Sequence, residues 1–161
     1  MAKPPRDRAP SASNTYFVTA NAFAGQAIFQ SERIANLLIE TLLDYRSQGK
    51  YLLHEFAIMP NHLHILFTTG TGVTLERAVQ FIKGGFSHRA GKCLEMHGEI
   101  WQRGYVDHRI RDVNDFAQHK QYIHQNPVCA NLVETPETYA FSSAFPSFEG
   151  DDPPQRLKPV S

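Results

Sequence analysis

Two histidines separated by a single residue, His62 and His64, are well suited to hold a metal ion. They open a run of β-branched and apolar residues that is typical of a strand, and residues i and i+2 of a strand project from the same face. Two imidazoles on one face can bind a divalent cation and leave further coordination positions open. The chain has eight histidines, so two unrelated histidines on a half-exposed strand remain an alternative interpretation.

A second group of polar residues falls on one face of a predicted helix. At about 100° per residue, a stripe with spacing i, i+4, i+7 and i+11 contains Asp115, His119, Tyr122 and Asn126. The core-facing stripe of the same segment contains Val113, Phe116 and Ile123. A phenol on a polar face beside metal-binding groups can serve as a nucleophile. The alternative is a tyrosine at the edge of the core that only makes a hydrogen bond to a neighbour.

Together the two groups indicate phosphoryl transfer. A tyrosine can attack a phosphodiester and form a phosphotyrosine, which keeps the bond energy for a later rejoining step. A metal ion on the two histidines would polarise the phosphoryl oxygen and orient the scissile phosphate. The sequence therefore predicts a nuclease or strand transferase with Tyr122 as its nucleophile.

These residues must be positioned by alternating strands and helices. In chain order we expect a strand at 15–19, a helix between Ser31 and Gly49, and strands at 51–59 and 62–68 joined by a Pro60-Asn61 turn. A second helix is expected from Thr74 through Phe86, with a weak point at Gly84-Gly85, and then a strand at 99–110. The last helix is expected to be capped by Asp112 or Asn114 and to end at Pro127. We expect residues 51–59 to alternate regularly, with Leu53, Glu55, Ala57 and Met59 on one face. This order predicts an α+β fold, namely a ferredoxin-like (split βαβ) antiparallel sheet with an added C-terminal helix that carries the catalytic tyrosine.

Length and composition agree with a single domain. The chain has 161 residues, 16 Lys and Arg against 16 Asp and Glu, and no apolar run long enough to span a membrane. Pro-rich segments at residues 1–14 and 149–161 are predicted to be flexible tails around a domain at 15–148. Cys93 and Cys129 form no CxxC pair, which fits a reducing cytoplasm.

The motifs resemble those of a known family. The chain is similar to the REP-associated tyrosine transposases, in the Y1 family of HUH single-strand DNA nucleases. Four segments carry this resemblance, namely Met59–His64, Trp101–Tyr105, Tyr122–Val128 and Tyr139–Ser143. The resemblance covers roughly residues 15–145. It implies a ferredoxin-like HUH fold and Mg²⁺- or Mn²⁺-dependent endonuclease and strand-transfer activity on hairpins of repetitive extragenic palindromes. The intermediate would be a covalent 5′-phosphotyrosine.

Carried over to this chain, the resemblance assigns His62 and His64 as metal ligands and Tyr122 as the nucleophile. The third ligand is open. In insertion-sequence relatives it is a glutamine four residues after the tyrosine, and here that position is Asn126, whose side chain is one methylene shorter. His119, one turn earlier on the same stripe, is the competing candidate, and water can complete the coordination shell.

The middle of the chain is basic although the whole chain is neutral. Between residues 83 and 111 there are three acidic residues and six basic ones, which are Lys83, Arg89, Lys92, Arg103, Arg109 and Arg111. Phe86, Trp101 and Tyr105 are interleaved, and cations beside stacking aromatics are typical of single-strand DNA binding. The alternative is a solvated charged surface over buried aromatics. A neutral average predicts selective binding to hairpins and weak affinity for bulk DNA.

Three functions remain after this reading. The first is a tyrosine transposase that nicks and rejoins single-stranded or hairpin DNA with REP-like repeats by transesterification. The second is a non-catalytic nucleic-acid-binding module on the same sheet, and the third is a metallohydrolase that uses bound water. We expect a cytoplasmic bacterial protein whose substrate is nucleoid DNA, without a membrane partner. The resemblance favours a monomer, with a homodimer as the alternative.

Overall fold

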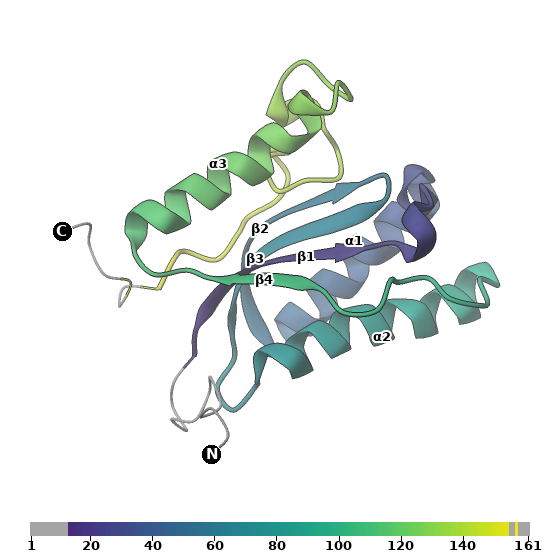
Figure 1. The fold of residues 1–161 in the computed structure, drawn as a ribbon, viewed down its shortest axis with the longest axis horizontal. Coiled ribbons are helices and arrows are strands. Elements are labelled where there is room, and N and C mark those ends of the chain that lie inside the picture. The colour runs from purple at the N-terminus through teal and green to yellow at the C-terminus, as the bar shows by residue number, and fades with distance from the viewer. Residues whose placement is uncertain (1–12, 155–156, 158–161) are drawn as a thin grey trace.

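The computed structural model describes residues 13–154 and 157, and its centre is a four-stranded antiparallel sheet (Figure 1). The sheet order is β2 (Tyr51–Met59), β3 (His62–Thr69), β1 (Thr15–Asn21) and β4 (Val106–Arg109). The helices are α1 (Glu32–Ser47), α2 (Leu75–Leu94) and α3 (Val113–Cys129), with short 3₁₀ turns at Phe23–Gly25, Ile28–Gln30 and Pro136–Thr138. The split βαβ order confirms the predicted ferredoxin-like α+β fold with an added C-terminal helix.

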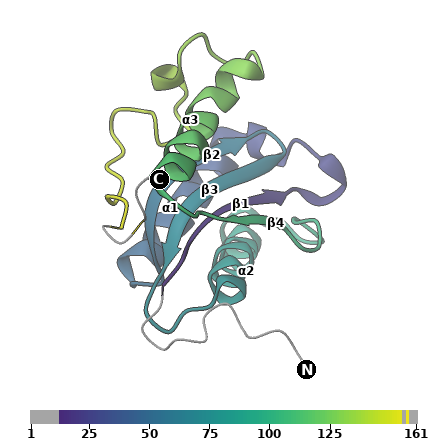
Figure 2. The ribbon, with the colours of Figure 1, turned by 60° about the vertical axis from the view of Figure 1, so that its left-hand side comes forward.

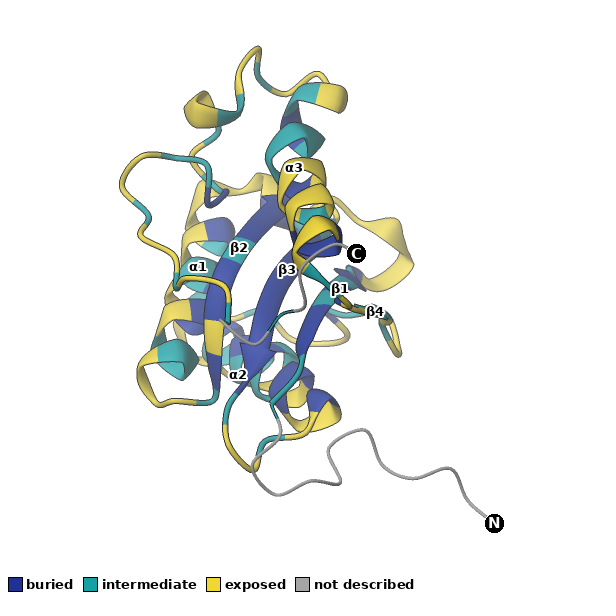
Figure 3. Ribbon diagram, turned by 90° about the vertical axis from the view of Figure 1, so that its left-hand side faces the viewer, coloured by how far each residue is buried: buried dark blue, intermediate teal, exposed yellow. Residues whose placement is uncertain are grey.

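The sheet has two covered faces. Helices α1 and α2 lie side by side on one face and α3 lies across the other (Figures 1 and 2). Strand β3 serves both faces, since Leu63, Ile65 and Phe67 belong to the core under α1 and α2, whereas Leu66 packs with residues of α3. His62 and His64 therefore project toward α3. Figure 3 shows this arrangement, with buried strands beneath an α3 whose outer side is exposed.

The helix starts agree with the sequence. Side chains of Ser31, Thr74 and Asp112 each accept a hydrogen bond from a backbone N–H in the first turn of α1, α2 and α3. Helix α2 continues through Gly84-Gly85 to Leu94, and a Cβ on Gly85 would collide with the ring of Tyr45 on α1. The glycine thus permits close packing of the two helices. No helix among the described residues is both long and apolar enough to cross a bilayer.

Three predictions about individual elements are wrong, two about boundaries and one about the faces of a strand. The strand predicted at 99–110 is continuous only over Val106–Arg109, with a separate bridge between Trp101 and Ala22, because Gly104 adopts a positive φ of 74° and interrupts the extended backbone. Helix α3 continues past Pro127 to Cys129, and the Ala130 N–H bonds back to the Asn126 carbonyl.

The third error concerns the faces of β2. A bulge between Leu53 and Glu55 shifts the register against β3. As a result Leu53 joins Phe56 and Ile58 in the core under α1 and α2, while Ala57 and Met59 pack with α3. Side chains therefore alternate on each side of the bulge, but Leu53 does not share a face with Ala57 and Met59 as predicted.

The chain after α3 returns along the outer edge of β2. Backbone bonds join the Ile58 N–H to the Phe141 carbonyl and the Ser143 N–H to the Phe56 carbonyl. These contacts continue beyond residue 148, although we expected a flexible tail to begin there. Asp151 accepts two hydrogen bonds from Arg46, at 2.9 Å each, and one from the Leu53 N–H at 2.8 Å. Residues 1–12, most of the predicted N-terminal tail, lie outside the described residues.

His54 is a buried contact between this returning segment and the sheet. Its Nδ1 lies 2.7 Å from the Asp151 carbonyl and its Nε2 2.7 Å from the Thr68 hydroxyl. Burial lowers the pKa of His54 below its ordinary 6.5, although the nearby Asp151 and Glu55 oppose this shift. The folded protein therefore holds this imidazole neutral at pH values where the unfolded chain would bind a proton.

We expect the free energy of unfolding to fall as the pH drops from 7.5 to 5.5, because the unfolded state then takes up more protons than the folded state. In His54→Gln the fall should be smaller. The measurement is urea unfolding at several pH values, with His88→Gln, which alters an exposed histidine of α2, as the control. An unchanged pH slope in His54→Gln would contradict the assignment.

Candidate active site

The two histidines of β3 face each other closely enough to share one metal ion. The His62 Nε2 and His64 Nε2 atoms are 3.1 Å apart. Two nitrogens that coordinate one cation at about 2.1 Å and a right angle stand about 3 Å apart. The alternation of β3 brings the rings to one face, as the sequence predicts, and the Pro60-Asn61 turn places them at the end of the hairpin. The residues present therefore fit a divalent metal.

Neighbouring side chains orient both rings through the nitrogen that faces away from the pair. His62 Nδ1 donates to Asn61 Oδ1 at 2.7 Å, which leaves Nε2 with its lone pair toward His64. His64 Nδ1 shares a 2.8 Å hydrogen bond with the hydroxyl of Thr19, the residue directly opposite on β1. Because a hydroxyl can donate or accept, Thr19 can support either tautomer of His64.

Burial keeps this pair uncharged. His64 is only 4% exposed, and burial together with the adjacent His62 lowers the pKa of His64 to about 3. Burial also lowers the pKa of His62. Near neutral pH both imidazoles are thus uncharged, which is the form that binds a metal, and His64 offers its Nε2 lone pair in the tautomer that keeps its proton on Nδ1.

Helix α3 brings Tyr122 to the same place. Its ring lies edge-on to His64 with 5.4 Å between ring centroids, and it also contacts Phe17 of β1 at 5.8 Å. Tyr122 is 51% exposed, so its side chain is accessible to a substrate. The helix is held to the sheet by Phe116 and Ile123, which are two of the three residues predicted to face the core, while Val113 is exposed.

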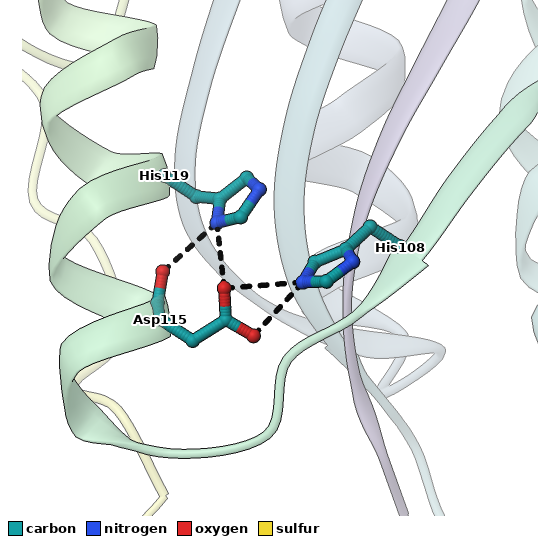
Figure 4. A group of neighbouring side chains, drawn as sticks. All are labelled: His108, Asp115 and His119. Atoms are coloured by element: carbon teal, nitrogen blue, oxygen red, sulfur yellow. Dashed lines mark hydrogen bonds and ion pairs between the residues drawn. The ribbon is translucent and has the colours of Figure 1, made fainter. Parts of the chain in front are cut away.

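The two candidates for a third ligand occupy different surroundings. Asn126 lies one helical turn beyond Tyr122 and is half-buried. His119 is held by Asp115 one turn earlier and stacks on His108 of β4, with ring centroids 4.7 Å apart (Figure 4). The Phe17 ring contacts both His119 and His64, at 4.9 and 5.3 Å between centroids.

Sequence reasoning missed Thr19, Phe17 and Asn61 as parts of this site. Thr19 and Phe17 lie on β1, and their role depends on the β1–β3 register, which pairs Thr19 with His64. The signal for that register was the alternation along β1, of which we predicted residues 15–19 as a strand without assigning its faces. Asn61 was recognised as a turn residue, and its side chain also orients His62.

The predicted DNA-binding residues do not form one surface. Lys83 and Arg89 lie on α2, on the sheet face opposite Tyr122, and both have protein partners. Lys83 donates to the carbonyls of Gln102 and Gly104 at 3.0 and 2.8 Å, and burial lowers its pKa. Arg89 forms an ion pair with Asp44.

The remaining four cations lie in separate places. Lys92 is exposed near the end of α2, and Arg103 is exposed in the loop before β4. Arg109, which donates to Asn14 at 3.0 Å, and Arg111 lie exposed where β4 leads into α3. Arg109 lies opposite Tyr16, a residue of the core under α1 and α2, so its side chain points away from α3. Arg111, which approaches Asp115 at the start of α3, is therefore the member of this group that the fold brings to the α3 side of the sheet.

The three aromatic residues of this segment belong mainly to the core. Phe86 is fully buried, and Trp101 and Tyr105 pack against the same core cluster. The Trp101 indole donates to the Lys83 carbonyl at 3.1 Å and its ring contacts Phe29 and Phe86. The alternative of buried aromatics under a charged surface thus describes these residues better than a stacking platform.

Comparison with known proteins agrees with the predicted family and with the fold. The family model described as "Transposase IS200 like" matches residues 19–126, a stretch that contains both histidines, Tyr122 and Asn126. A Haemophilus influenzae protein named "Putative REP-associated tyrosine transposase" is 25% identical over 81% of this chain and 89% of its own length. An Escherichia coli REP-associated tyrosine transposase is 25% identical over 66% of this chain and 62% of its own.

A solved structure has the same fold. It is a REP-associated tyrosine transposase bound to a REP hairpin, and it superimposes with a TM-score of 0.72 at 20% identity over 100% of this chain and 99% of that one. At this identity the likeness is one of fold, and it includes the helix that follows β4.

We expect Thr19→Val to weaken Mn²⁺ binding by about 10-fold or more, because an outer residue that orients a metal-binding histidine typically contributes that much affinity. Calorimetric titration of the protein with Mn²⁺ measures the change. Thr15→Val makes the same chemical change on the same strand, where the hydroxyl contacts Thr68, and should leave the affinity unchanged. Equal affinities for all three proteins would contradict the role of Thr19.

Proposed function

This chain belongs to the IS200-like transposase family, and from that premise we propose that it is a metal-dependent single-stranded DNA endonuclease and strand transferase. Tyr122 is the nucleophile, and His62 and His64 hold a Mg²⁺ or Mn²⁺ ion. The substrate is hairpin DNA of REP type, and the intermediate is a 5′-phosphotyrosine. The observation that carries this proposal is the 5.4 Å approach of the Tyr122 ring to His64 within one chain.

That approach gives one phosphate group room to contact both functional groups. The phosphorus that is attacked and the oxygen that contacts the metal belong to the same phosphate group. The nucleophile and the metal ligands must therefore lie close together. When bound on the histidine pair, the cation supplies Lewis-acid polarisation of a phosphoryl oxygen. The half-exposed Tyr122 supplies the hydroxyl, and the buried histidines keep a fixed orientation through Thr19 and Asn61.

The chemical step exchanges one phosphodiester for another. The Tyr122 Oη loses its proton to solvent and attacks the scissile phosphorus, the bond from phosphorus to the 3′ oxygen breaks, and the leaving oxygen gains a proton as a free 3′-OH. The new bond joins Tyr122 to the 5′ phosphate. Attack by a 3′-OH on this phosphotyrosine reverses the exchange and joins two DNA ends without an added energy source.

The choice of substrate rests on relatives. REP-associated transposases of two bacteria match this chain in sequence, and the solved structure with the same fold is a complex with a REP hairpin. Arg111 lies at the start of α3, on the Tyr122 side of the sheet, and of the six predicted cations it is the one best placed to contact DNA that reaches Tyr122. Because one chain supplies both histidines and the tyrosine, a monomer with a self-contained site is sufficient.

We expect a covalent protein–DNA adduct when the protein is incubated with a labelled single-stranded REP hairpin and Mn²⁺. Tyr122→Phe should form no detectable adduct and no nick, because the attacking oxygen is gone. Denaturing gel electrophoresis measures both products. Tyr45→Phe is the matched control. It removes a phenol hydroxyl from α1, on the sheet face opposite α3, and should retain full activity.

The same gel separates the three functions. Nicks without an adduct that survive in Tyr122→Phe would indicate a water-using metallohydrolase. Hairpin binding without any cleavage, independent of Mn²⁺, would indicate a binding module. Either outcome would refute the proposed nucleophile.

We further propose Asn126 as the helix-side ligand, since His119 is engaged by Asp115. Asn126→Ala should lower both Mn²⁺ affinity and the nicking rate about 10-fold or more, whereas His119→Gln should leave the nicking rate at saturating Mn²⁺ within a factor of about 3. Nicking rates over a Mn²⁺ titration measure both effects. A loss confined to His119→Gln would reverse the assignment.

A further inference from the structure

Three side chains from two elements converge beside the active site. His108 of β4 places its Nε2 at 2.8 and 3.1 Å from the two carboxylate oxygens of Asp115, and His119 places its Nδ1 3.1 Å from Asp115 Oδ1 (Figure 4). One ligand atom from each residue can be chosen so that all three lie within 4.8 Å of one another. Asp115 is buried, and the two histidines are partly exposed.

This geometry matches a three-ligand transition-metal site. Histidine nitrogen and carboxylate oxygen bind zinc at about 2.0 to 2.2 Å, which places the ligand atoms roughly 3 to 3.5 Å apart. The contacts of 2.8 and 3.1 Å to the carboxylate are close to that range, so small side-chain movements would complete the site. Two imidazoles and one carboxylate favour Zn²⁺ over Mg²⁺, which prefers a shell of oxygen ligands.

The backbone fixes the central ligand. Asp115 accepts the Arg111 N–H at 2.9 Å through its side chain, and its own N–H donates to the cap residue Asp112 at 2.8 Å. One ligand is thus held rigidly in the first turn of α3, while the strand residue His108 approaches it from β4. The Arg111 guanidinium is 3.7 Å from the carboxylate but largely exposed, so it can turn into solvent when a cation enters.

Metal binding would replace one local hydrogen bond. His119 Nδ1 also donates to the Asp115 backbone carbonyl at 2.8 Å, and this bond is lost when the nitrogen coordinates a metal. The carbonyl keeps a partner, because in an α-helix it also accepts the backbone N–H four residues later. No buried polar atom is left without a partner by the exchange.

We propose that His108, Asp115 and His119 form a second metal site, specific for Zn²⁺, that fastens the start of α3 to β4. The site is separate from the His62–His64 pair, since the Phe17 ring lies against both His64 and His119. A cation here does not touch the scissile phosphate. It fixes the helix one turn before Tyr122, and the inference does not depend on the proposed DNA cleavage.

The test counts zinc ions in four versions of the full-length chain. All carry Cys93→Ser and Cys129→Ser, because exposed thiols are competing zinc ligands. The first protein carries only these two changes and is called the background. The other three add His62→Ala, His108→Gln, or both substitutions together. Calorimetric titration with Zn²⁺ in the presence of millimolar Mg²⁺ measures the number of sites, and far-UV circular dichroism verifies folding.

We expect His108→Gln to bind one equivalent of zinc fewer than the background, while His62→Ala retains the site lost in His108→Gln. Zinc at about 100 times its dissociation constant should raise the melting temperature of His62→Ala by about 5 °C. The double variant should show no such rise. Amide hydrogen exchange in the first turns of α3 should slow on zinc addition in the background and in His62→Ala, but not in the two proteins that carry His108→Gln.

Two outcomes would overturn the site. One is an unchanged zinc count in folded His108→Gln, and the other is a His62→Ala protein that binds no zinc at micromolar concentration. Both differ from a failure of the proposed function, which would appear as absent DNA cleavage with the zinc site intact.

Discussion

The alternation of side chains along β3 is the constraint on which the other features of the site depend. Leu63, Ile65 and Phe67 are buried against α1 and α2, and a slip of one residue would move them to the other face. Because this apolar core fixes the register of β3 against β1, it also fixes His62 and His64 toward α3. The position of the candidate metal ligands is thus a consequence of hydrophobic burial on the opposite face of the sheet.

The position of Tyr122, the proposed nucleophile, depends on a second set of contacts, those that dock α3. Phe116 and Ile123 pack against the sheet, and His124 reaches Glu55 of β2 at 2.6 Å. Ser143 in the returning segment donates to the same carboxylate at 2.7 Å. The β2 bulge places Glu55 where these groups can meet. Helix, strand and C-terminal segment are therefore joined at one carboxylate, which limits rotation of α3 and of Tyr122 with it.

The sequence was sufficient for the features that depend on local periodicity. The chain order of strands and helices, the shared face of His62 and His64 and the polar stripe with Tyr122 follow from spacings of two or of three to four residues. The helix caps at Ser31 and Thr74 follow from residue type, which left Asp112 and Asn114 as alternatives for the third cap. The features that it did not predict depend on pairing between distant segments. Examples are the contact of Thr19 with His64, which requires the β1–β3 register, and the anchoring of Asp151, which requires the bulge at His54.

The basic segment shows why charge along a sequence is a weaker guide than periodicity. A count of cations between residues 83 and 111 treats every side chain as available to DNA, but two of them serve the protein itself. Lys83 holds the carbonyls of the loop before β4, and Arg89 pairs with Asp44 to join α1 and α2. The cations on the side of Tyr122 are then few. Each phosphate contact adds affinity that does not depend on DNA sequence. With the proposed hairpin substrate, a small number of such contacts would make hairpin shape a larger part of recognition than charge.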